Sequence, residues 1–340
     1  MLNIFPEVTN RMEKSPTPGR GATSMNLRAA AVLTAAIFSA IPSTVAVAAP
    51  AAPAPGAPAL KVLTTNTMLL PSVISDGWAQ DERGGLIGSA PYVSGNDVVV
   101  FQELFDNSAS EILMNRLRGY PYKTPVIGRS RDGWDATRGA YSTLPYEDGG
   151  VAIASRWPIT RKMQYIYNDS CGADAWAEKG FAYAQLNVAG KAVHVLGTHL
   201  QADDDGCDDG EGAQTRTAQL KEMHGFVDSL KIPLDEPVIY TGDLNINRYG
   251  PEYPGLLRTL SAAAPGYAGH PYTSDPQTNP LTAERYPDAP REWLDYVLYD
   301  SRHARPTTWT NTGQAVYSPW WELDDTVYNR YSDHYPVLGS

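Results

Sequence analysis

The sequence contains little cysteine and no concentrated positive charge. Only two of its 340 residues are cysteines, Cys171 and Cys207, and no Cys/His cluster has the spacing of a zinc site. The net charge is −11, and no basic cluster is denser than "GRSRDGW", which holds Arg129 and Arg131. An acidic surface repels phosphate backbones over about 8–10 Å at ordinary ionic strength. Broad electrostatic binding of nucleic acid is therefore disfavoured, and no nucleic-acid partner is expected.

A long hydrophobic run is also absent. The run "AAAVLTAAIFSAI" after Arg28 has 13 residues, fewer than the roughly 20 that span a bilayer as a helix. A Pro- and Ala-rich tail follows it, an order typical of a secretory signal peptide with cleavage after Ala48. We expect residues 1–48 to be this signal and the protein to be secreted. Met25 is a second candidate start, so residues 1–24 are an upstream extension in that case.

After a Pro/Ala-rich linker at residues 49–59, residues 60–340 are expected to form a single α/β domain. Without the signal the net charge moves to −13, because four basic and two acidic residues are lost. Seven short apolar runs, bounded by Gly, Pro or Asp, are typical of buried strands; they are "LKVLTTNTM", "DVVVFQEL", "GGVAIASR", "FAYAQLNV", "AVHVLGTHL", "PVIYTGDLN" and "WLDYVLYD". Helices are predicted over 107–120, 213–230 and 254–264, the first beginning at a capping box of Ser108 and Glu111. No coiled-coil pattern is present, so a monomer is expected.

Several of these apolar runs end in a residue that can bind metal or move a proton. Rigid strands hold side chains to the tolerance that catalysis needs. Each such residue alone is more often a strand cap or a solvated edge. Asp243 and Asn245 are two positions apart, so an extended backbone would direct both to one face. The candidates at the ends of the runs are Asn66, Glu103, His199, Asp243 and Asp295, and "SDHYP" adds Asp333 and His334.

The ordered series "QE", "GTHLQ", "GDLN", "LDY" and "SDHYP" resembles the DNase I-like endonuclease/exonuclease/phosphatase superfamily over residues 60–340. The stretches "EDGGVAIASRWPI", "GTHLQADD" and "PWW" and the placement of the two cysteines are similar to the secreted bacterial neutral sphingomyelinases. The resemblance implies a four-layer sandwich, in which two mixed β-sheets pack face to face with helices outside. It also implies Mg²⁺-dependent hydrolysis of sphingomyelin to ceramide and phosphocholine, with other divalent cations as alternatives.

The resemblance also assigns a metal site. Glu103, aided by Asn66, would supply the oxygen ligands that Mg²⁺ prefers. Asp333 is either a further metal ligand or a residue that supports the site from behind.

The same resemblance assigns the proton-transfer groups. His334 would be the general base, neutral near pH 7, with Asp295 orienting its ring. Asp243 and Asn245 would position water and phosphate. His199 would donate to the phosphoryl oxygen or to the leaving alkoxide.

The two cysteines and the acidic run "ADDDGC" indicate where the choline group of the substrate could bind. In an exported chain Cys171 and Cys207 are expected to form a disulfide, with two buried thiols as the alternative. Choline is a fixed cation that needs carboxylates or aromatic faces. Asp174 and Asp204 are therefore candidate substrate-binding residues, although a solvated loop would have the same composition.

Two neighbouring tryptophans, Trp320 and Trp321, stand in the polar stretch "SPWWELDD". Pro319 before them and the acidic residues after them favour a hairpin or a loop tip over a core position. Because Trp prefers the membrane–water interface, both are predicted to contact the outer leaflet beside the site. Two core aromatics are the alternative.

Three further functions remain open at this point. A secreted metal-dependent nuclease would share the metal and the histidines but would need a basic groove. A phospholipase C acting on other choline phospholipids would differ only in the pocket. A membrane-binding module without catalysis would have lost catalytic residues. The expected partner is a membrane surface that contains sphingomyelin, and no protein partner is implied.

Overall fold

The computed structural model describes residues 57–58, 60–72, 77–143 and 147–340. The predicted signal peptide and nearly all of the predicted linker lie outside these residues. The described residues belong to one compact unit, Ala51–Ser340. None of its described helices is both long and apolar enough to cross a bilayer.

The first sheet has seven strands in the order β10-β12-β15-β1-β2-β5-β3. It is mixed, because β1 pairs in parallel with β2 and antiparallel with β15. Its strands are β1 (Val62–Leu69), β2 (Val98–Leu104), β3 (Tyr122–Lys123), β5 (Ala152–Ser155), β10 (Gly266–Gly269), β12 (Thr310–Gly313) and β15 (Val337–Gly339).

The second sheet has six strands in the order β11-β9-β8-β7-β6-β4. It is also mixed, because β9 pairs in parallel with β8 and antiparallel with β11. Its strands are β4 (Ala136–Gly139), β6 (Ile159–Ile166), β7 (Gly180–Val188), β8 (Lys191–His199), β9 (Val238–Asp243) and β11 (Asp295–Tyr299). A separate hairpin pairs β13 (Trp321–Leu323) with β14 (Thr326–Tyr328).

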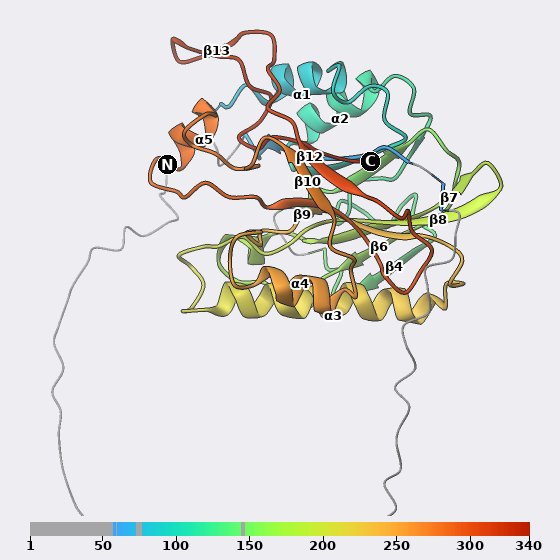
Figure 1. Cartoon of the computed structure of the whole chain (residues 1–340). Helices are drawn as coiled ribbons and strands as arrows, with labels where there is room; N and C mark the ends of the chain where they lie inside the picture. The colour runs from blue at the N-terminus through green and yellow to red at the C-terminus, as the bar shows by residue number, and fades with distance from the viewer. Residues whose placement is uncertain (1–56, 59, 73–76, 144–146) are drawn as a thin grey trace, which may run out of the picture. The chain divides into compact units, whose positions relative to one another are not determined.

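Helices cover the outer faces of the two sheets (Figure 1). Apolar side chains of α1 and α2 pack on the first sheet, and those of α3 and α4 pack on the second. A further core fills the space between the sheets, where Val100 and Ile153 meet Val195 and Ile239. The helices are α1 (Gln80–Gly88), α2 (Asn107–Arg116), α3 (Glu211–Leu230), α4 (Tyr253–Thr259) and α5 (Pro280–Arg285), with a 3₁₀ turn at Gly172–Trp176. The predicted four-layer sandwich is confirmed.

Helix α2 begins at Asn107, as predicted, but its N-cap is Asp106, two residues before the predicted cap. The carboxylate of Asp106 accepts the N–H of Ala109 at 3.0 Å and caps the helix, so the predicted capping box at Ser108 is wrong. The sequence "QDERGGLIG" of α1 lacks an apolar repeat and does not predict a helix. Its glycines serve close packing on α2, because a Cβ at Gly84 would lie 2.5 Å from the carbonyl oxygen of Ala109.

Candidate active site

Strand register brings three of the predicted catalytic residues side by side. His199 ends β8 and lies opposite Asp243, the last residue of β9. Asp243 in turn lies opposite Asp295, the first residue of β11. Adjacent strands are only about 4.8 Å apart, so the three side chains meet at one edge of the second sheet.

His334 reaches this edge from the segment that precedes β15. Its Nδ1 lies 2.9 Å from Oδ2 of Asp295 and 3.6 Å from Oδ2 of Asp243. A backbone bridge to Ser274 and a hydrogen bond from the His334 N–H to Oγ of Ser332 (3.2 Å) hold the residue in place. The ring nitrogen that faces Asp295 is thereby fixed, and the other nitrogen remains for a reacting group.

The carboxylates around His334 control its protonation. Burial opposes a charge on the imidazole, but Asp295 and Asp243 outweigh burial and raise the pKa of His334 well above its usual value. Burial, together with the negative charge of Asp295, raises the pKa of Asp243 to about 7. The two carboxylates therefore favour the imidazolium form of His334 in the metal-free protein. The neutral ring expected near pH 7 remains a prediction for the metal-bound site.

Glu103 and Asn66 bring the first sheet into the same site. Glu103 has a left-handed backbone, with φ of 56°, which directs it out of the regular strand pattern. The Asn66 amide donates to Oε1 of Glu103 (2.8 Å) and to Oδ2 of Asp243 (3.1 Å), and its oxygen accepts the N–H of Met68 (3.0 Å). Asn66 thus orients Glu103, and its amide oxygen, which accepts one hydrogen bond, keeps a second lone pair. Its role as a metal ligand remains a prediction.

The second oxygen of Glu103 is suited to a cation. Among the described residues, Oε2 of Glu103 is buried and has no hydrogen-bond partner. Burial and the nearby Asp333 raise the pKa of Glu103, so its charge is poorly compensated in the metal-free protein. A buried carboxylate in this condition favours a bound cation. The residues present therefore fit a hard divalent ion.

His199 is held in the opposite protonation state from His334. Burial and the cation of Lys179 lower the pKa of His199 well below its usual value. Its Nε2 lies 3.7 Å from Oδ2 of Asp243, and within the described part of the chain its buried Nδ1 has no partner. A neutral ring with one free nitrogen can act as a hydrogen-bond donor to an anion, as predicted for His199.

Asn245 reaches the site by a different backbone route from the predicted one. Its φ is 48°, so the chain leaves the extended conformation directly after Asp243. The N–H of Asn245 donates to Oδ1 of Asp243 (3.0 Å), and its amide donates to the carbonyl of Leu200 (3.0 Å). The argument from strand alternation is therefore wrong, although both side chains line the same pocket.

Asp333 is paired with a cation from α5. Nη1 of Arg285 lies 3.0 Å from Oδ2 of Asp333, and the hydroxyl of Ser332 donates to the other oxygen (3.1 Å). Burial works against its ionisation, but Arg285 and His334 outweigh burial and lower the pKa of Asp333. Of its two expected roles, support of the site agrees better with this pairing than metal binding does.

Most of these groups line one open pocket of about 890 Å³, whereas Asn66 and Asp295 lie behind the residues that line it. Arg285 and Tyr286 also belong to the lining. Glu292 is a further acidic group of the lining, and its Oε1 accepts from the Asn247 amide at 3.1 Å. The predicted site residues that line the pocket are Glu103, Asp174, His199, Asp204, Asp243, Asn245, Asp333 and His334.

The two candidate choline residues already have partners inside the protein. Asp174 lies 2.7 Å from Nζ of Lys179 and accepts the N–H of Ala202 (2.9 Å). Asp204 accepts the N–H groups of Ala173 (3.0 Å) and Gly206 (2.6 Å). Both therefore shape the rim of the pocket, and a role in binding choline remains a prediction.

The predicted disulfide between Cys171 and Cys207 is confirmed. It joins the loop after β6 to the loop after β8, 36 residues apart in the sequence. Asp174 lies three residues after Cys171, and Asp204 lies three residues before Cys207. The bridge therefore fixes both acidic loops beside the pocket.

The two neighbouring tryptophans have different environments. Trp320 is 68% exposed and immediately precedes β13, so it lies at the open end of the predicted hairpin and not at its tip, where Asp324 and Asp325 form the turn. Trp321 is only 3% exposed: it stacks on Tyr328 and donates its indole N–H to the carbonyl of Arg330 (2.8 Å). The expectation that Trp321 contacts a membrane is therefore wrong, and only Trp320 is available for that role.

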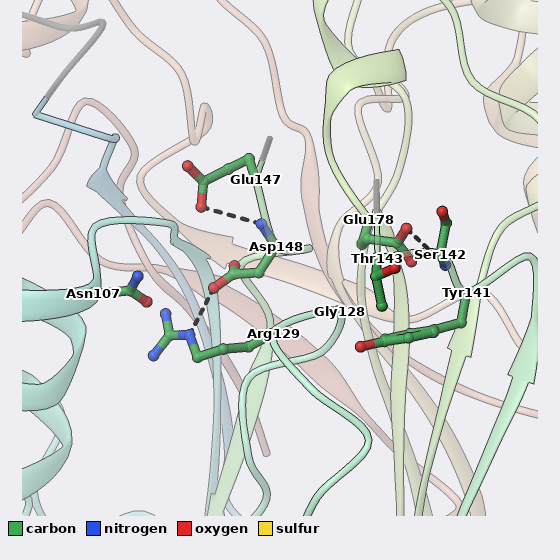
Figure 2. Close-up of a pocket in the computed structure, with 9 residues that line it drawn as sticks. All are labelled: Asn107, Gly128, Arg129, Tyr141, Ser142, Thr143, Glu147, Asp148 and Glu178. Atoms are coloured by element: carbon green, nitrogen blue, oxygen red, sulfur yellow. Dashed lines mark hydrogen bonds and ion pairs between the residues drawn. The ribbon is translucent and has the colours of Figure 1, made fainter. Parts of the chain in front are cut away.

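A second, smaller pocket of about 270 Å³, drawn in Figure 2, shares no lining residue with the first. Asp148 lies there, where its Oδ2 is 2.7 Å from Nε of Arg129 and its Oδ1 accepts the N–H of Gly150 (2.8 Å). Burial raises the pKa of Glu147 to about 7 and that of Asp148 to about 6. This pocket carries no part of the catalytic group.

Two basic residues of the site are not marked by any motif. Lys179 fixes Asp174 and the carbonyl of Leu200 (2.8 Å) and lowers the pKa of His199. Arg285 lies at the end of a six-residue helix. The only sequence signal for that helix is "NP" at Asn279 and Pro280, a typical helix start.

Comparison with known proteins agrees with this geometry. The Endonuclease/Exonuclease/phosphatase family model matches residues 77–334. Sphingomyelinase C of Bacillus cereus is 43% identical over 293 residues, which cover 83% of this chain and 88% of that protein. The crystal structure of sphingomyelinase C from Streptomyces griseocarneus shares 48% identity with a TM-score of 0.81, covering 83% of this chain and 99% of that one. A mutant of beta toxin from Staphylococcus aureus with bound magnesium ions shares 42% identity with a TM-score of 0.81, covering 82% and 98%. The chain therefore belongs to the endonuclease/exonuclease/phosphatase family and, within it, to the sphingomyelinases C.

Proposed function

We propose that this protein is a secreted, magnesium-dependent phosphodiesterase that hydrolyses sphingomyelin to ceramide and phosphocholine. The observation that carries the proposal is the meeting of Glu103, Asp243 and His334 at one pocket in a chain of this family. The disulfide supports secretion, because such bonds persist in oxidising compartments.

Glu103 would hold the metal, with Asn66 fixing its orientation. A magnesium ion held there would supply Lewis-acid polarisation of a phosphoryl oxygen and a positive charge that lowers the pKa of His334.

The remaining chemistry belongs to the chain. His334, oriented by Asp295, takes the proton of the attacking water. Asp243 and Asn245 place that water and the phosphate at the end of β9. His199, held neutral by burial, donates a hydrogen bond to the phosphoryl oxygen or to the departing ceramide alkoxide. Asp174 and Asp204 are the candidate contacts for choline at the rim.

Trp320 is the proposed membrane contact. An exposed Trp is suited to the interface of a bilayer, which an enzyme with a lipid substrate must reach. Exposed Val327 lies on the same hairpin and extends the apolar surface.

The test is phosphocholine release from sphingomyelin vesicles by the purified protein with Mg²⁺ or with EDTA. Phosphatidylcholine vesicles and supercoiled DNA are offered in parallel. We expect release from sphingomyelin that EDTA abolishes. Stronger release from phosphatidylcholine would favour the broader phospholipase C, DNA nicking alone would favour the nuclease, and vesicle binding without any release would favour a non-catalytic module.

A further inference from the structure

Arg285 brings a positive charge to a pocket that is otherwise acidic. Among the described residues that line the pocket it is the only arginine or lysine. It shares this lining with Glu103, Asp333 and His334. Its side chain is only 16% exposed, so the surrounding water screens its charge weakly.

Helix α5 is fixed to the catalytic segment that precedes β15. The side chain of Asn279 caps α5 by accepting the N–H of Leu281 (3.1 Å) and donates to the carbonyl of Ser332 (2.9 Å). The hydroxyl of Thr282 donates to the carbonyl of Asp333. These contacts tie the helix that carries Arg285 to the segment that carries His334, as two groups that act on one phosphate would require.

The guanidinium of Arg285 has N–H groups that do not donate within the described part of the protein. It donates through Nη1 to Asp333 (3.0 Å) and through Nη2 to the hydroxyl of Tyr286 (2.9 Å), and these are its hydrogen bonds within the described part of the chain. The ring of Tyr286 also lies against it, 5.0 Å from centroid to guanidinium carbon. Since a guanidinium carries five N–H donors, three remain for a ligand. A planar fork of this kind matches two oxygens of a phosphate.

We propose that Arg285 is a further catalytic residue, which binds the non-bridging oxygens of the phosphodiester and of the phosphocholine product. The inference rests on the proposed function and names the group that binds its phosphate. The competing role is structural: Arg285 would only neutralise Asp333 beside His334. The two roles make different predictions for phosphate binding and for a double mutant.

Binding is measured first, by calorimetry in EDTA, so that no metal contributes. The ligands are inorganic phosphate, phosphocholine and choline. Arg285→Gln should lower the affinity for phosphate and for phosphocholine at least tenfold and should leave the affinity for choline unchanged. Arg138→Gln, which removes an exposed arginine on β4, should change none of the three. Equal phosphate affinity in wild type and Arg285→Gln, or no phosphate binding by wild type, would overturn the proposal.

Turnover of sphingomyelin with Mg²⁺ is then measured for Arg285→Gln, Asp333→Asn and the double variant. Loss of one such donor typically costs about 10²–10³ in rate, and Arg285→Lys should recover part of it. If Arg285 is catalytic, Arg285→Gln should still lower the turnover rate at least tenfold in a protein that already carries Asp333→Asn. If that cost disappears in the Asp333→Asn background, Arg285 is only a positioning residue. Failure of the proposed function would look different, because wild type itself would release no phosphocholine.

Discussion

His334 Nδ1 lies 2.9 Å from a carboxylate oxygen of Asp295, a residue 39 positions earlier that begins β11. The contact fixes which nitrogen of the ring faces the substrate. It also ties the acid–base behaviour of His334 to a carboxylate on the neighbouring strand, because Asp295 raises the pKa of the imidazole.

Asp295→Asn should change the pH dependence of turnover. A general base works in its neutral form, so activity rises as the pH passes its pKa. Removal of the Asp295 charge lowers the pKa of His334, and the acid limb of kcat/KM should move to lower pH. The maximum rate should fall by about 10²-fold or more because the ring loses its orientation. An acid limb in the wild-type position would contradict the assigned pair.

Glu103→Gln should weaken the response to magnesium. The amide keeps the shape and an acceptor for Asn66 but loses the charge that favours a cation. Titration of activity with Mg²⁺ should show a midpoint at least tenfold higher, or no activation. Glu284→Gln removes an exposed carboxylate on α5 and serves as the matched control, with an unchanged midpoint expected. The same shift in both variants would argue against a metal site at Glu103.

Trp320→Ala and Trp321→Ala should separate membrane binding from stability. Loss of exposed Trp320 should reduce sedimentation with sphingomyelin vesicles and leave the melting temperature unchanged. Loss of buried Trp321 should cost about 3–5 kcal/mol in the free energy of unfolding. Vesicle binding by Trp320→Ala at the wild-type level would remove the proposed membrane contact.

Asp275 should make stability depend on pH below about 5. It is buried and accepts from Arg291 (2.8 Å), Thr278 (2.8 Å) and His270 (2.9 Å). Burial opposes ionisation, but these hydrogen bonds outweigh it and lower the pKa of Asp275 to about 2. Because the folded-state pKa is the lower one, the stabilisation is present above the unfolded pKa of about 4 and is lost as the pH falls through about 2.

The size of that contribution is about 2 kcal/mol, from 1.36 kcal/mol per pKa unit. Unfolding by urea at several pH values would measure it. Asp275→Asn should be less stable than wild type at pH 6, and the difference should shrink towards pH 2. A difference that does not depend on pH would show that the carboxylate charge has no part in it.

The buried strands could be predicted from the sequence because each layer of the sandwich hides both faces of its central strands. β1, β2, β5, β7, β8, β9 and β11 all fall on apolar runs that flanking Gly, Pro or Asp residues delimit. Helix α1 could not be predicted, since its glycines serve contact with α2 and depress helix propensity. The local sequence pattern does not predict α1, because the close contact with α2 requires glycines in place of good helix formers.

The functional site, like the fold, could be predicted from the sequence only in part. The strand-end residues could be predicted, because the register of β8, β9 and β11 turns three separate motifs into neighbours. The burial of Trp321 could not, because it depends on Tyr328 and Arg83 packing on its ring across the hairpin and from α1. Arg285 could not be predicted either, since no motif marks a residue whose partner, Asp333, lies 48 positions away.

Turnover of sphingomyelin by His334→Ala tests the account most directly. His334 is the proposed acceptor of the proton of the attacking water, so its loss should lower kcat by about 10²–10⁴-fold. Circular dichroism and the melting temperature should stay close to wild type, because the ring lies at the pocket wall. A folded His334→Ala protein that releases phosphocholine at the wild-type rate would contradict the central claim.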